Sequence, residues 1–234
     1  MLGRSAIATG LLLLAGCTHD PLVEAEVYPG LVAVEEPRGE LVPVLFSAPD
    51  APARQSLLFV AMYDAGVAAQ NASLTQAAAS LDEVKSRVAE VLYAIDPALA
   101  PDWWAKDTGF ARVWAGSGYG MRRAARRMIE EIDAALADPT ASAGLRTYGP
   151  RAVRCVENAL GRTDEVVALG DQILAAGPRD DVDPLLRELQ RVTLALTDGV
   201  PSPYAEGCGL EQAFLYLSQI GTEVAADQPA PTAG

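Results

Sequence analysis

Aromatic side chains are concentrated between residues 103 and 119, where they form the best local candidate for a binding site. This stretch holds every tryptophan of the chain together with one phenylalanine and one tyrosine, namely Trp103, Trp104, Phe110, Trp114 and Tyr119. Rigid aromatic faces act as hot spots in protein interfaces, and sugar rings stack on them. We therefore expect a surface that binds a protein or a glycan. The alternative is that the rings close one end of a helix bundle.

Four arginines follow this stretch, at Arg122, Arg123, Arg126 and Arg127. We expect them on the helix face opposite a stripe of methionine and isoleucine side chains. Glutamates lie four residues after the last two arginines, and such pairs contribute only about 0.2–0.5 kcal/mol each, so a solvated face would explain the cations. The alternative is a face that docks an acidic partner or an anionic glycan substituent, because cations near the start of a helix oppose its dipole.

Histidine-dependent catalysis has no candidate in the sequence. The only histidine is His19, in a segment that we expect to be a tether. Serine and cysteine triads, zinc sites with histidine ligands and c-type haem attachment therefore lose an essential member.

Carboxylates offer only weak alternatives. Asp180, Asp181 and Asp183 lack the glycine and the later glutamate of a calcium loop, and the last of them suits a helix cap. Glu157 and Glu206 are lone carboxylates, and no second carboxylate can be assigned beside either one. We expect no catalytic residue, no cofactor and no metal, and hence a protein that is not an enzyme.

The first seventeen residues have the pattern of an export signal. A positive charge at Arg4 precedes an apolar run from Ala6 to Ala15, which is too short to cross a bilayer core of about 30 Å. The order Leu14-Ala15-Gly16-Cys17 resembles the lipobox of bacterial lipoproteins. The resemblance implies that residues 1–16 are removed and that Cys17 is lipidated. An ordinary secretory signal cut near Ala15 is the alternative.

The lipid anchor predicts where the protein resides. Two or three acyl chains hold a folded domain on a membrane, whereas one chain binds only marginally. A residue other than aspartate after the cysteine, here Thr18, resembles an outer-membrane address. We therefore expect the protein on the periplasmic face of the outer membrane, with the lipid as its only membrane contact.

Lipidation would leave two cysteines, Cys155 and Cys208, in a compartment where disulfides persist. A bond closing a loop of this length would stabilise the fold by about 4 kcal/mol in the chain-entropy account. We expect this bond, with two separate buried thiols as the alternative.

The charge of the chain argues against nucleic acid as a partner. The 234 residues carry a net charge of −13, which becomes −14 when Arg4 is removed with the signal. An acidic chain repels nucleic acid and anionic headgroups. Envelope proteins, or peptidoglycan and other glycans, are the expected partners.

The distribution of proline divides the chain into a tether and a helical domain. We expect a signal peptide at 1–16, the lipidated cysteine and a proline-rich tether at 17–55, a helical domain at 56–225 and a disordered tail at 226–234. Within the tether, residues 31–34 and 41–46 flank a turn-forming Glu-Pro-Arg-Gly sequence and suggest a short hairpin.

Apolar spacing predicts an all-α bundle of about six to seven helices. Leu57–Tyr63 is apolar nearly all round and should be central. Possible capping boxes begin at Ser73 and Ser80. The remaining helices are predicted over 81–95, 121–136, 150–160, 164–177, 184–199 and 210–224.

The segment 164–178 weakly resembles the second half of a tetratricopeptide-like helical hairpin, by its acidic start and closing proline. The resemblance implies stacked helices that present a surface to a partner.

These features together favour a non-enzymatic, lipid-anchored domain that assists an envelope protein complex. The alternative is a peptidoglycan- or glycan-binding lipoprotein, or an all-helical lytic enzyme that uses one glutamate.

Overall fold

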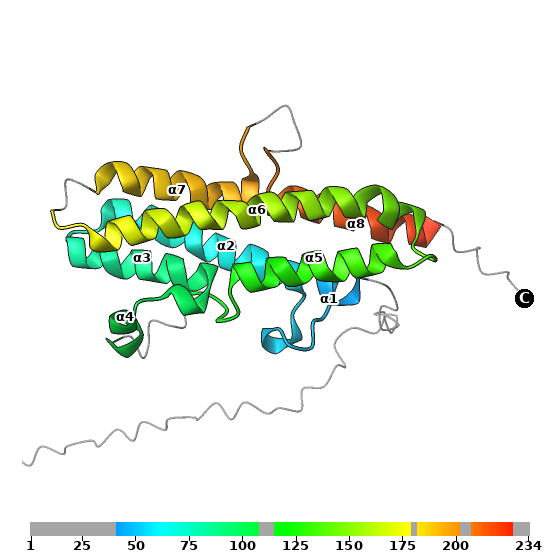
Figure 1. The fold of residues 1–234 in the computed structure, drawn as a ribbon, viewed down its shortest axis with the longest axis horizontal. Coiled ribbons are helices and arrows are strands. Elements are labelled where there is room, and N and C mark those ends of the chain that lie inside the picture. The colour runs from blue at the N-terminus through cyan, green and yellow to red at the C-terminus, as the bar shows by residue number, and fades with distance from the viewer. Residues whose placement is uncertain (1–40, 108–114, 179–181, 202–206, 227–234) are drawn as a thin grey trace, which may run out of the picture. The chain divides into compact units, whose positions relative to one another are not determined.

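The computed structural model describes residues 41–107, 115–178, 182–201 and 207–226, and these residues form a helical bundle without strands (Figure 1). The predicted all-α class is confirmed. The α-helices in the described part are α1 (Val42–Leu45), α2 (Leu57–Leu74), α3 (Leu81–Ile95), α4 (Asp102–Asp107), α5 (Met121–Ala137), α6 (Ala143–Ala175), α7 (Asp183–Asp198) and α8 (Leu210–Ala226). The short helices α1 and α4 were not predicted.

Helix α2 is the central helix, as its apolar sequence predicts. Its N-cap is Ser56, whose hydroxyl accepts a hydrogen bond from the N–H of Phe59 at 3.1 Å. The helix contacts α3, α5 and α7 along its length. Burial is not complete, however, because Phe59 and Tyr63 are 51% and 44% exposed and stack on each other along one edge.

The hairpin strand predicted at 41–46 is wrong. This segment contains α1, whose first turn includes Pro43, a position where the missing N–H of proline is not needed. Leu41, Val44, Ala48 and Ala51 are buried in the same core as α2. This part of the predicted tether therefore packs against the bundle.

Residues 143–175 form one continuous helix, α6, where two helices were predicted. Pro150 and Gly161 lie inside α6, and Thr163 does not cap a new helix but donates its hydroxyl to the carbonyl of Leu160. A proline costs about 3 kcal/mol in a helix interior and a glycine about 1 kcal/mol. Both positions are exposed, and the buried stripe that continues past them on the other face of α6 offsets these costs; it contains Leu145, Ala152, Val156, Ala159, Val166 and Ile173. No turn therefore separates two helices near Gly161, and the helical-hairpin resemblance stays a prediction.

Helix α6 joins the two halves of the bundle (Figure 1). Helices α5 and α8 pack along its N-terminal half, and α3 and α7 pack along its C-terminal half. At its C-terminal end, Lys85 of α3 donates to the carbonyl of Ala176 at 2.8 Å. At the interface with α3, Gly170 permits close packing, because a Cβ there would lie 2.8 Å from Leu92.

Cys155 of α6 and Cys208, just before α8, lie at disulfide distance, with 5.1 Å between their Cα atoms. Beside them the guanidinium of Arg162 donates to the carbonyls of Ala195, Gly207 and Cys208. Burial lowers the pKa of Arg162. These bonds fix the segment that precedes α8 onto α6.

No helix among the described residues combines the length and the apolar character needed to cross a bilayer. Cys17, residues 31–34 and residues 227–234 lie outside the described residues, as does the predicted signal peptide.

Candidate functional site

A cleft of about 490 Å³ opens beside the N-terminal half of α5, and we call it the α5 cleft. Its walls come from α5, from the loop 115–120 that precedes it and from the short helix Pro97–Leu99. The lining residues are Asp96, Pro97, Ala98, Gly118, Tyr119, Arg123, Arg126, Arg127 and Glu130. Three arginines therefore converge on one opening of an acidic protein.

Glycines shape the loop that enters α5. Gly116 and Gly120 have φ values of +128° and +89°, which side chains on L-residues rarely adopt. A Cβ at Gly120 would lie 2.7 Å from the ring of Pro97, and one at Gly116 would lie 2.9 Å from a carboxylate oxygen of Asp64. The backbone can therefore turn tightly against α2 and reach the first residue of α5.

Asp64 anchors this loop from the middle of α2. Its side chain is fully buried and accepts hydrogen bonds from the N–H and the hydroxyl of Ser117, at 2.6 Å each, and from the N–H of Gly120 at 3.1 Å. Gly120 is the N-cap residue of α5 and has no side chain with which to cap it. The Asp64 carboxylate thus binds the free N–H at this helix end from a distant helix.

Burial raises the pKa of Asp64, while the hydrogen bonds from Ser117 and Gly120 oppose that rise. Asp64 was not among the site residues predicted from the sequence. The sequence did carry a signal, because Asp64 is the only charged residue of the central helix α2 and follows its apolar first turns. An isolated charge in such a segment indicates a buried polar network.

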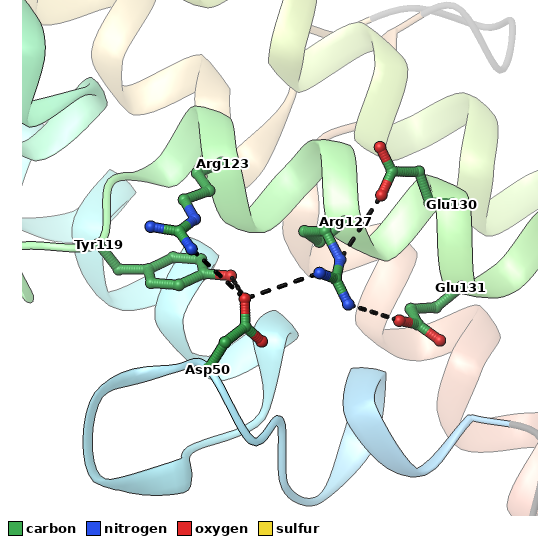
Figure 2. Close-up of polar contacts among 6 residues, drawn as sticks. All are labelled: Asp50, Tyr119, Arg123, Arg127, Glu130 and Glu131. Atoms are coloured by element: carbon green, nitrogen blue, oxygen red, sulfur yellow. Dashed lines mark hydrogen bonds and ion pairs between the residues drawn. The ribbon is translucent and has the colours of Figure 1, made fainter.

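Asp50 organises two of the arginines at the edge of the α5 cleft (Figure 2). One of its oxygens accepts a hydrogen bond from the Tyr119 hydroxyl at 2.8 Å and lies 3.5 Å from Arg123 and 3.7 Å from Arg127. The Tyr119 hydroxyl, followed by the positive charges of Arg127 and Arg123, lowers the pKa of Asp50. The Arg123 guanidinium also lies over the Tyr119 ring, 4.2 Å from its centroid.

The arginines of α5 have different surroundings. Arg127 pairs with Glu131 at 2.8 Å and with Glu130 at 3.5 Å (Figure 2). Arg126 is exposed and forms no ion pair or hydrogen bond with the described residues. It is therefore the cation of the cleft whose donors remain available.

Arg122 lies away from the cleft, and the prediction that it shares a solvated face with the other arginines is wrong. Its side chain is only 12% exposed, donates to the Thr163 hydroxyl at 2.7 Å and pairs with Asp164 of α6. Arg122 therefore fastens α5 to α6.

The predicted aromatic surface is only partly present among the described residues. Trp104 is buried against Ala89 and Tyr93 of α3 and against Ala115, in a small cluster separate from the main core. Tyr119 is also buried, and its hydroxyl reaches Asp50. Trp103 is 49% exposed. Phe110 and Trp114 lie outside the described residues.

The described side chains offer no group of three or more histidine, cysteine, aspartate or glutamate residues arranged to hold a metal ion. Asp183 is the first residue of α7, and the N-cap position belongs to Val182. The chemistry that the α5 cleft supports is recognition of charge by arginine donors.

Comparison with known proteins adds no relative: no protein-family model, curated protein or solved structure matches the chain.

Proposed function

We propose that this chain is a non-enzymatic lipoprotein, anchored at Cys17 to the periplasmic face of the outer membrane, that binds a protein partner of the cell envelope through the α5 cleft. The observation that carries the proposal is the convergence of Arg123, Arg126 and Arg127 on one cleft of an acidic chain. Two of these arginines are held by Asp50, and the third has no bond to a described residue.

The mixed charge of the cleft favours a protein over an extended polyanion. Asp96 and Glu130 line the same opening as the three arginines. A polyphosphate or an anionic lipid surface would meet these two carboxylates and the negative field of the whole chain. A protein surface carries both signs of charge, and matching them determines its orientation in the cleft.

The anchor follows from the order Leu14-Ala15-Gly16-Cys17. Acyl chains on Cys17 would hold the bundle at the membrane without a membrane-spanning helix. Mass spectrometry of the N-terminal peptide tests this part of the proposal, because lipidation adds a diacylglyceryl group to Cys17. A Cys17→Ser variant should be released into the soluble periplasmic fraction.

Site-specific photo-crosslinking in living cells tests the binding surface. A photoreactive residue at Arg126 should give a discrete crosslinked product, whereas the same residue at Arg187, an exposed arginine of α7, should not. In a chain that keeps Cys17, the Arg126→Glu variant should co-purify less of the partner than the wild type does. Equal crosslinking from both positions, or none from Arg126, contradicts the proposed cleft.

A second candidate function, peptidoglycan binding, is favoured by one observation, the exposure of Trp103 on α4. An exposed indole can stack on a sugar ring. Sedimentation with purified peptidoglycan tests this reading by comparing Trp103→Ala with Phe46→Ala, which removes another exposed aromatic ring. Loss of sedimentation in the tryptophan variant alone would favour the glycan.

A further inference from the structure

A second cleft, of about 330 Å³, lies between α6 and α8, and we call it the α6–α8 cleft. It is lined by Pro150, Arg151, Arg154, Cys155 and Tyr216. Two cations therefore face this opening and no carboxylate lines it, in contrast to the α5 cleft.

Aromatic rings hold one of these cations in place. The guanidinium carbon of Arg151 lies 5.9 Å from the ring centroids of both Tyr148 and Tyr216. The two rings lie 6.4 Å apart and are nearly parallel. Contact with ring faces orients a guanidinium while leaving its N–H donors available.

Neither arginine is neutralised by a described residue. Arg151 and Arg154 are both exposed, and no hydrogen bond or ion pair joins either side chain to another described residue. Other cations of the bundle, such as Arg122 and Arg191, form ion pairs with carboxylates. The α6–α8 cleft therefore keeps two neighbouring positive charges available in a chain with a net charge of −13.

The floor of the cleft is covalently restrained. Cys155 lines it, and its partner Cys208 stands two residues before α8. The pair and the Arg162 bonds beside it hold α6 and the start of α8 together. A surface that is ordered before binding loses little entropy when a ligand arrives.

We propose that the α6–α8 cleft binds an acidic segment of a protein partner, whose Asp or Glu carboxylate is held by Arg151 and Arg154 against the ring of Tyr216. This inference rests on the proposed function in that it assumes a protein partner, but it uses a different surface. Tyrosine and arginine are the residue types enriched at the energetic centres of protein interfaces. Two cations match one or two carboxylates, whereas nucleic acid requires a larger array of cations.

Arginine side-chain NMR of the full-length Cys17→Ser chain tests the inference. The probe is acetyl-hexaglutamate amide at low salt, with acetyl-hexaglutamine amide as the uncharged control. The glutamate peptide should shift the Nε–Hε signals of Arg151 and Arg154, and it should leave those of Arg54 and Arg187 unchanged. The glutamine peptide should shift none of them.

Matched double variants separate the cleft from net charge. Arg151→Gln with Arg154→Gln should weaken peptide binding by about tenfold or more, because it removes a pair of charge-assisted hydrogen bonds. Arg54→Gln with Arg187→Gln makes the same change in net charge at two exposed arginines and should alter the affinity by less than about twofold. Circular dichroism should show an unchanged helix content in both variants.

Equal shifts of all exposed arginines, equal losses in the two double variants, or no binding of the glutamate peptide would overturn the inference. So would signals that respond to phosphatidylglycerol vesicles and not to the peptide, since a lipid surface would then be the ligand. Any of these results leaves the photo-crosslinking at Arg126 unaffected, so the two proposals fail separately.

Discussion

Asp64 and Ser117 are joined by two hydrogen bonds of 2.6 Å, one from the backbone N–H of Ser117 and one from its hydroxyl, although 53 residues separate them in the chain. This contact connects the central helix to the loop that begins α5, and hence to the α5 cleft. Asp64 is buried and holds the loop that leads into α5, whereas Asp50 at the edge of the cleft pairs with Arg123 and Arg127.

Removing this carboxylate should destabilise the fold. Asp64→Ala leaves the buried donors of Ser117 and Gly120 without their acceptor, and we expect the free energy of unfolding to fall by about 3 kcal/mol. Chemical denaturation monitored by circular dichroism measures this loss. Asp133→Ala removes an exposed carboxylate from α5 and should change stability by less than about 0.5 kcal/mol. A loss no larger than that of the control would contradict the anchoring role of Asp64.

The raised pKa of Asp64 predicts a specific pH dependence. Because its folded pKa lies above the unfolded value, the native state binds the proton more tightly, and ionisation of this group opposes folding. The stability that protonation of Asp64 contributes is fully present below the unfolded pKa, and it is lost as the pH rises through the folded pKa. The stability of the wild type relative to Asp64→Asn should therefore increase as the pH falls from neutral, measured as paired denaturation midpoints. A difference that shrinks on acidification would show that the carboxylate is stabilised in its charged form.

The Cys155–Cys208 pair should account for a large part of the stability. Cys155→Ser with Cys208→Ser releases a loop of 53 residues, and we expect a loss of about 4 kcal/mol. The reduced wild type should unfold at the same denaturant concentration as the double variant. A reductant that leaves the wild-type midpoint unchanged would indicate that the cysteines are not bonded in solution.

Two glycine substitutions should have opposite signs. Gly120→Ala places a Cβ against Pro97 at a positive φ and should cost about 1–3 kcal/mol. Gly66 lies on an exposed face of α2, and a Cβ added there would have no other atom within 4 Å. Gly66→Ala should therefore stabilise the fold by about 0.5–1 kcal/mol. Thermal melts of both variants give the comparison. Similar behaviour of the two would mean that the loop before α5 tolerates a side chain.

Local signals in the sequence predicted most helix starts but not helix continuity. Ser80 caps α3 as its spacing indicates, and Ser56, where the helical domain was predicted to begin, caps α2. Ser73 instead lies in the last turn of α2 and donates to the carbonyl of Ala69. Pro150 and Gly161 are likewise typical of helix ends. The free-energy cost of placing them inside a helix is offset by packing between segments far apart in the chain, which local sequence patterns do not predict.

The candidate site was predictable in part. Apolar spacing placed the Met–Ile stripe of α5 in the core, so Arg123 and Arg126 had to face outward. The burial of Arg122 could not be predicted in this way, because its partner Thr163 belongs to a helix that is distant in the sequence. Asp50, Tyr119 and Arg127 meet through tertiary contacts between segments about 70 residues apart, which periodicity cannot show.

Helix α6 is a single helix of 33 residues, about 50 Å long, and other helices pack against both of its halves. Because one helix carries the buried stripe of both halves, we expect the molecule to melt in one cooperative step. Amide protons at the two ends of α6 would then exchange through the same global opening. A protease cut near Gly161 should therefore release no stable fragment.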